Sequence, residues 1–132
     1  MLNILRLKDI FRDKNGKTLP YVKDITRSGA VVIVKLHGFI DSNTIPTIEA
    51  DISDKRYNYL DSNILLDFGE VTHVDSTTLA YLISLLHSLK AHHRRLGIIN
   101  AGAALLNYIN IEKVGELVHI YKTEEEALKD LA

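Results

Sequence analysis

One stretch of the chain concentrates side chains that could do chemistry. It runs from Asp67 to Leu79 and contains an adjacent carboxyl and hydroxyl group at Asp75 and Ser76. Either side chain could accept a hydrogen bond from the free N–H groups at the start of a helix, as N-cap residues do. Alternatively, Ser76 could accept a phosphoryl group, because the positive end of a helix dipole favours the added charge of about −2. The local sequence leaves both interpretations open.

The same stretch does not indicate a catalytic or metal-binding site. His73, Asp75 and Ser76 are the residue types of a hydrolase triad, but they are sequence neighbours and no Gly-x-Ser-x-Gly elbow is present. The six histidines include no His-Glu-x-x-His pattern, and the chain has no cysteine. The glycine-rich loops that bind nucleotide phosphates are also missing from the sequence. We therefore expect no enzyme activity, no metal and no cofactor.

Two apolar strands must hold these residues at one edge of a sheet. Residues 30–36 and 64–68 are almost continuously apolar and rich in β-branched side chains, which is typical of strands covered on both faces. We expect the first strand to end at Gly38 and the second at Gly69, with a loop from there to Asp75.

Two further acids accompany these strands. Asp41 comes shortly after the first strand, and Asp67 lies at the end of the second. If the strands are neighbours in the sheet, both carboxylates lie near Ser76. We expect Asp67 to brace the loops there and Asp41 to belong to a surface that a partner recognises.

Helical patterns alternate with the strands. A helix over 77–93 is predicted by apolar residues on one face of a 3.6-residue repeat, namely Leu79, Leu82, Ile83, Leu86 and Leu89, and Gly97 follows it as a stop signal. Further helices are expected after Thr44 or Asn43, over 103–108 and after Thr123, and further strands over 22–26, 96–100 and 117–121. The pattern predicts a single α/β domain with a mixed sheet of about four or five strands and helices mainly on one side.

Length and composition agree with one ordinary globular domain. The 132 residues carry 16 Lys and Arg against 17 Asp and Glu, so the net charge of −1 favours neither nucleic acid nor an anionic membrane as a partner. No apolar run is long enough to span a bilayer, and the first residues do not resemble a signal peptide, so we expect a cytoplasmic protein. We assign 21–132 to the domain and 1–20 to an N-terminal extension. There Asn15-Gly16 favours a hairpin turn, with a short helix over 2–11 as the alternative.

From about Tyr21 to Leu131 the chain resembles a STAS domain, the family of anti-sigma factor antagonists and sulfate-transporter C-terminal domains. The resemblance rests on residues 36–41 and 65–67, and above all on residues 74–79, which are similar to the Asp-Ser-Ser-Gly-Leu segment of the family. Thr77 replaces the second Ser of that segment. Thr78 replaces its Gly, which puts a branched side chain where we expect a partner to come close.

The resemblance implies a cytoplasmic, non-enzymatic binding switch. The unphosphorylated protein would bind an anti-sigma factor that is a serine kinase-like protein, and phosphorylation of Ser76 would end the binding, with Thr77 as a second candidate acceptor. Gly38 and Asp67 would give structural support. The alternative is a static STAS subunit of a membrane complex that transports lipids or anions. The oligomeric state stays open. We expect the partner to contact a surface made of Asp41, Ser42, Asp75, Thr77, Thr78 and Leu79.

Overall fold

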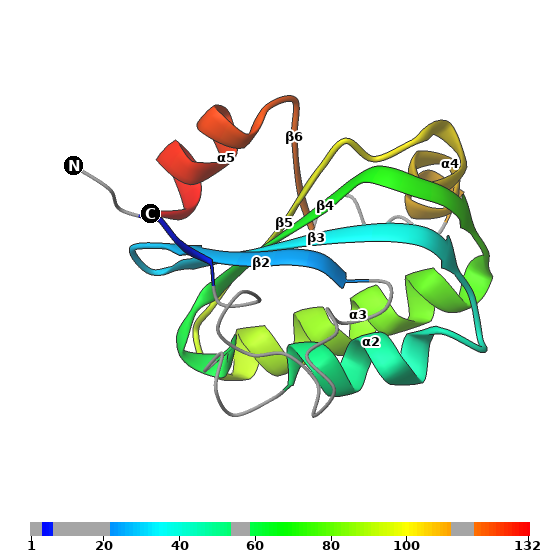
Figure 1. Ribbon diagram of the computed structural model, residues 1–132, viewed down its shortest axis with the longest axis horizontal. Coiled ribbons are helices and arrows are strands. Elements are labelled where there is room, and N and C mark those ends of the chain that lie inside the picture. Colours follow the sequence, from blue (N-terminus) through cyan, green and yellow to red (C-terminus); the bar gives the residue numbers. More distant parts are fainter. Residues whose placement is uncertain (1–3, 7–21, 54–58, 112–117) are drawn as a thin grey trace.

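The computed structural model describes residues 4–6, 22–53, 59–111 and 118–132 (Figure 1). The elements follow one another in the order β1 (Ile4–Arg6), β2 (Val22–Ser28), β3 (Val31–Ile40), α2 (Ile45–Ile52), the 3-10 helix η2 (Tyr59–Asp61), β4 (Asn63–Val74), α3 (Ser76–Ala91), β5 (Leu96–Ile99), α4 (Ala103–Ile111), β6 (His119–Tyr121) and α5 (Glu124–Leu131). The alternation of strands and helices after β3 is that of the predicted α/β domain.

The described strands form one mixed sheet of six strands, in which the spatial order equals the order along the chain. β1, β2 and β3 pair antiparallel, whereas β3 to β6 pair parallel. The parallel neighbours are joined through α2, α3 and α4, because parallel strands cannot be connected by a tight turn. β1 lies within residues 1–20, which we assigned to an N-terminal extension, and residues 4–6 form a strand and not part of the alternative helix. The predicted turn at Asn15-Gly16 lies outside the described residues.

Two hydrophobic clusters cover the two faces of the sheet. Val32 and Val34 of β3 belong to the larger cluster, together with side chains from α2, α3 and α4. Val31 and Ile33 belong to the smaller cluster, which α5 completes, because successive side chains of a strand point to opposite faces. Figure 1 shows α2 and α3 on one side of the sheet and α5 on the other. The predicted fold class, with helices mainly on one side, is confirmed, and the sheet has six described strands where we expected about four or five, because β1 adds a strand at its edge.

β3 and β4 both continue past the glycines at which we expected them to end. Gly38 has a φ of +78°, and the register of the β3–β4 pair shifts on either side of it. Such a β-bulge bends a strand without ending it, and a positive φ favours glycine. β4 likewise passes Gly69, and residues 70–74 pair with β3 where we expected a loop.

α3 is the long predicted helix. It begins one residue and ends two residues earlier than the range 77–93, and the chain leaves it through His93 in the left-handed region with a φ of +58°. Its buried leucines include those predicted, but Leu85 is buried where we expected Ile83. Gly97 lies inside β5, so it does not serve as the stop signal of the helix.

Polar contacts fasten α5 to the sheet. The Tyr121 hydroxyl donates a hydrogen bond to the Asp130 carboxylate, and the Arg95 guanidinium lies 3.3 Å from the same carboxylate. The Asn63 amide donates to the Leu131 carbonyl at 2.5 Å. The pKa of Tyr121 is raised above its ordinary value of 10.0, first because the phenol is buried and then because it donates to Asp130.

This contact makes the stability of the fold depend on pH in the alkaline range. The folded state holds the Tyr121 proton more tightly than the unfolded chain, so the stabilisation is complete below about pH 10 and is lost as the pH rises further. At neutral pH, Tyr121→Phe should lower the free energy of unfolding by about 1 kcal/mol, the contribution of one hydrogen bond. Urea unfolding should show this difference shrinking above about pH 10. Parallel pH curves for the two proteins would contradict the assignment.

Candidate functional site

The carboxyl ends of β3 and β4 meet at one edge of the sheet. The two strands are parallel neighbours, and their last residues, Ile40 and Val74, are register partners. The loop after β3 and the start of α3 therefore lie side by side. We call residues 41–44 together with residues 75–78 the carboxyl edge.

Asp75 caps α3. Its backbone is extended, and its carboxylate accepts hydrogen bonds from the Thr77 N–H at 3.0 Å and from the Thr77 hydroxyl. The pKa of Asp75 lies below its ordinary value of 3.8, chiefly because the Thr77 hydroxyl donates to it. Partial burial opposes this shift, and the backbone N–H groups of Thr77, Thr78 and Ser42 add to it. The carboxylate is therefore charged at neutral pH, which the positive end of the helix favours.

Ser76 is the first residue of α3 and does not cap it. Its side chain is exposed, and its hydroxyl makes no hydrogen bond within the part of the chain that the structure describes. The neighbouring Thr77 hydroxyl, in contrast, is bound to Asp75. The cap and the free hydroxyl thus belong to different residues, so Asp75 can hold the helix while Ser76 stays accessible.

Hydrogen bonds tie the two halves of the carboxyl edge together. The Thr78 hydroxyl donates to the Ile40 carbonyl at 3.1 Å. In the other direction, the Ser42 N–H donates to the Asp75 carboxylate. The relative position of the loop and the helix is therefore held from both sides.

Asp41 holds the turn that follows β3. Its carboxylate accepts hydrogen bonds from the N–H groups of Asn43 at 2.9 Å and Thr44 at 3.2 Å. The Thr44 hydroxyl donates to the Phe39 carbonyl and accepts from the Asp41 N–H, both at 2.9 Å. Asp41 is thus half-buried and fixed in place, with Ser42 exposed beside it.

A groove of about 260 Å³ opens from the carboxyl edge and runs between α2 and α3. Ser42 and Thr77 form its end at the carboxyl edge. The groove therefore offers space for a partner side chain close to Ser76. Its other lining residues come from the two helices and are Ile45, Pro46, Glu49, Ala80, Tyr81 and Ser84.

Two residues predicted to contact a partner belong to the interior instead. Thr78 is 1% exposed and Leu79 is 7% exposed. The prediction is wrong for this pair because α3 turns both side chains towards the sheet. Thr78, which stands where the family has Gly, therefore binds the Ile40 carbonyl and does not obstruct the approach of a partner.

Asp67 lies far from the carboxyl edge. Its carboxylate accepts from the Gly69 N–H at 2.8 Å and from the Asn100 amide at 2.9 Å, and it lies 4.0 Å from the Lys35 ammonium group. It precedes the end of β4 by seven residues, which is about 23 Å along a strand. The prediction that Asp67 lies near Ser76 is wrong, because β4 continues past the expected end of the strand.

The bond between Thr78 and Ile40 should contribute measurably to stability. Thr78→Val keeps the branched shape but removes the hydroxyl, and it leaves a buried carbonyl without this partner. We expect the free energy of unfolding to fall by about 1–3 kcal/mol in urea denaturation. The control is Thr72→Val on the exposed surface of β4, which should change it by less than about 0.5 kcal/mol. An equal loss in both variants would contradict the role of the Thr78 hydroxyl.

One exposed aromatic side chain next to the carboxyl edge was not predicted as a functional residue. Phe39 is 60% exposed, and its ring lies against that of His73 on the neighbouring strand, with the ring centroids 5.3 Å apart. We call this pair the aromatic step. Lys35 and His37 lie on the same face of β3 as Phe39, because they are four and two residues before it, and both are partly exposed. This alternation of polar residues is the sequence signal that could have predicted the exposure of Phe39.

The fold and the carboxyl edge define a single α/β domain in which a mixed sheet presents the Asp-capped start of its longest described helix. The STAS domain family matches residues 22–127. The chain belongs to this family, as the resemblance predicted. No curated protein sequence matches the chain. Among the described residues, no helix is long and apolar enough to cross a membrane.

Solved structures share this fold at low sequence identity. An anti-sigma factor antagonist from Mycobacterium paratuberculosis is 21% identical, with a TM-score of 0.70 over 81% of this chain and 90% of that chain. The Bacillus cell fate determinant SpoIIAA in its phosphorylated form is 21% identical, with a TM-score of 0.60 over 78% and 92%. The anti-sigma factor antagonist SpoIIAA in its unphosphorylated form is 19% identical, with a TM-score of 0.61 over 79% and 90%.

Proposed function

We propose that this protein is a cytoplasmic, non-enzymatic binding switch of the anti-sigma factor antagonist kind. Unphosphorylated, it binds an anti-sigma factor that is a serine kinase-like protein, and that kinase ends the binding by phosphorylating Ser76. The observation that carries the proposal is that Asp75 caps α3, which leaves the adjacent Ser76 hydroxyl exposed and unbound within the described residues. The names of the similar structures, which include anti-sigma factor antagonists and a phosphorylated form, support it.

The partner covers the accessible part of the carboxyl edge. Asp41, Ser42, Asp75 and Thr77 are exposed or half-buried, and the groove between α2 and α3 accepts a partner side chain next to them. Hydrogen bonds hold the loop and the helix together before binding, so the surface is preorganised and loses little conformational entropy in the complex. We therefore expect the loop after β3 and the start of α3 to keep their conformation when the partner binds.

A phosphate on Ser76 ends the binding through charge and volume. It adds about two negative charges and three oxygens beside the Asp75 carboxylate, whose lowered pKa keeps it ionised. In the free protein, water screens these charges and the helix dipole favours the phosphate. In a complex the interface excludes water, so the neighbouring like charges repel strongly and the phosphate occupies the space of the partner. Loss of the complex follows without a change of fold.

The contacts at the carboxyl edge support binding in preference to catalysis. The Asp75 carboxylate is occupied by Thr77 and the Ser42 N–H, and the His73 ring lies against Phe39. A Ser-His-Asp triad needs the carboxylate on the histidine and the histidine on the serine hydroxyl. These side chains are engaged elsewhere.

The experiment is a titration of the purified protein against the anti-sigma serine kinases encoded in the same genome, with nucleotide present. We expect one of them to bind the unphosphorylated protein, to add the mass of one phosphate at Ser76, and to bind the product at least about ten-fold more weakly. If no kinase binds and subunits of a membrane transporter do, the protein is the static STAS subunit.

A further inference from the structure

The aromatic step lies on an uncovered part of the sheet. It faces away from α2 and α3, because the next residues on each strand, Ile40 and Val74, point into the larger hydrophobic cluster. α5 packs against the same face only near the opposite ends of these strands. Phe39 is the most exposed large hydrophobic side chain in the described part of the chain, and Ile120 follows at 39%. Aromatic side chains are enriched at the centres of protein–protein interfaces, so this ring is the candidate anchor for a partner.

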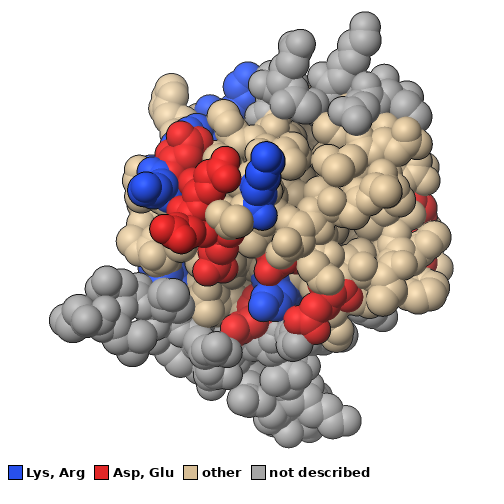
Figure 2. All heavy atoms as spheres, turned by 90° about the horizontal axis from the view of Figure 1, so that it is seen from above, with Lys and Arg blue, Asp and Glu red and all other residues tan. Residues whose placement is uncertain are grey.

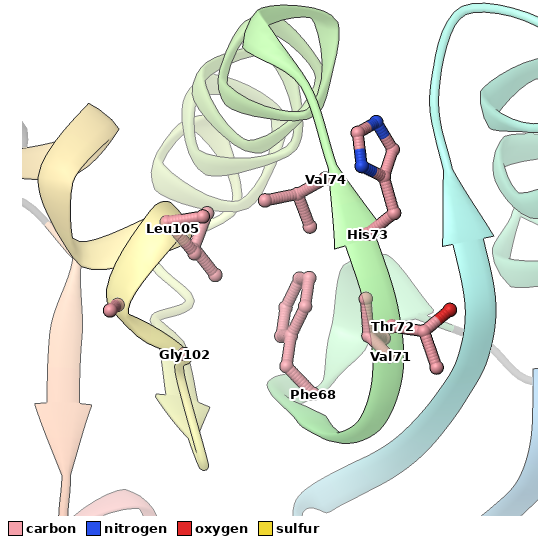
Figure 3. A pocket seen from close by; sticks show the side chains of 9 residues that line it. Phe68, Val71, Thr72, His73, Val74, Gly102 and Leu105 are labelled. Atoms are coloured by element: carbon pink, nitrogen blue, oxygen red, sulfur yellow. The ribbon is translucent and has the colours of Figure 1, made fainter.

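An apolar cavity of about 170 Å³ lies beside the aromatic step, between the end of β4 and the start of α4. Figure 3 shows Phe68, Val74 and Leu105 pointing towards one another across it. His73 also belongs to the lining, although its ring points away from these three side chains. Small residues, 102–104, form the wall on the side of α4. The end of β4 therefore has the aromatic step on one face of the sheet and the apolar cavity on the other, and both faces are available to a partner.

The charged residues nearest the aromatic step in the sequence are acids, and the nearest cation on the same face of β3, Lys35, lies 4.0 Å from the Asp67 carboxylate. Residues 36–45 and 68–80 form the ends of β3 and β4 and the first residues after each strand, and they contain no Lys or Arg but include Asp41, Glu70 and Asp75. In Figure 2, the described residues of the right-hand part, on the side where Figure 1 shows the ends of β3 and β4, are mainly uncharged and include no Lys or Arg. A second copy docked through this surface would place acids against acids, which disfavours a symmetric dimer. A different protein with basic residues fits instead.

We propose that the aromatic step anchors the partner of the switch: a large apolar side chain of the anti-sigma protein packs on Phe39 and His73, and a basic residue beside it faces Asp41. This inference rests on the proposed function and adds the chemistry of the partner surface. Phe39 comes two residues before Asp41, and His73 three residues before Ser76, so one partner reaches both the step and the acceptor. The basic residue of the partner neutralises the acids of the unphosphorylated protein. A phosphate on Ser76 adds negative charge that this residue does not neutralise, so the complex becomes weaker.

The test measures binding of Phe39→Ala to the anti-sigma kinase found by the titration. We expect the affinity to fall at least about ten-fold, because a central aromatic anchor carries a large share of binding energy. Ile120→Ala is the matched control, since it removes the second exposed large hydrophobic side chain of the described residues, on β6 and not on β3 or β4, and it should bind like the wild type. Thermal melts check that both variants fold. Affinity for the wild type should also fall as salt is raised, because the proposed charge pair is screened.

The outcomes separate this inference from the proposed function. If Ser76→Asp still weakens binding but Phe39→Ala binds like the wild type, the anchor is wrong and the switch stands. Failure of the wild-type protein to bind any kinase would overturn both. If sedimentation shows a dimer that Phe39→Ala disperses, the surface serves a second copy and the proposed partner chemistry is wrong.

Discussion

Ser76→Ala should abolish phosphate incorporation by the kinase partner and leave the fold intact. The substitution removes the exposed hydroxyl that we propose as the acceptor. It does not remove the helix cap, because the Asp75 carboxylate accepts the hydrogen bond from the Thr77 N–H. The free energy of unfolding should therefore stay within about 0.5 kcal/mol of the wild type. Radiolabelled ATP or intact-mass measurement gives the incorporation, and urea unfolding gives the stability.

Two neighbouring variants serve as controls for this result. Asp75→Ala loses the cap but keeps the acceptor, and it should lower the free energy of unfolding by about 1–2 kcal/mol. Thr77→Ala should still be labelled. Incorporation into Ser76→Ala at the level of the wild type would contradict the assignment and make Thr77 the acceptor. Ser76→Asp should bind the kinase more weakly than Ser76→Ala, and equal affinities would favour the static subunit.

Leu82→Ala should cause the largest loss of stability among the substitutions considered, about 2–5 kcal/mol in the free energy of unfolding. Leu82 is 1% exposed and lies in the larger hydrophobic cluster between α3 and the sheet. Removing its side chain loses apolar burial and leaves a cavity that neighbouring groups fill only in part. Urea denaturation followed by circular dichroism measures the change.

Ile83→Ala is the matched control for this prediction. Ile83 was predicted on the buried face of the helix, but its side chain is only partly buried and packs at the border of the cluster. Its truncation should therefore cost clearly less than that of Leu82. Equal losses at the two positions would show that α3 is rotated from the orientation described, since successive residues of a helix are about 100° apart.

The composition of each segment was enough to predict most elements of this fold. Continuous β-branched runs mark strands covered on both faces, as found for the first parts of β3 and β4. Leucines at helical spacing mark α3, and Thr123 before three acids marks the start of α5, where its hydroxyl accepts from the Glu126 N–H at 3.1 Å. These signals are local, because each depends on residues within one or two turns of the same segment.

The ends of the strands were not predictable in this way. Gly38 and Gly69 are local signals for a break, yet β3 and β4 pair with each other beyond both glycines. The hydrogen bonds of that pairing come from a distant segment, and a bulge accommodates the glycine conformation at Gly38. Because β4 continues to Val74, Asp67 lies seven residues before the end of the strand and is not part of the candidate site.

By itself, the sequence determined the family, the α/β class and the position of the Asp75-Ser76 pair at the start of a helix, because these follow from residue types at short spacing. The tertiary structure alone decided which of the two caps the helix, that Thr78 binds the Ile40 carbonyl inside the protein, and that Phe39 is exposed beside His73. Each of these depends on the direction of a side chain relative to a neighbouring strand or helix. That direction is set by the packing of segments far apart in the chain, which local spacing does not specify.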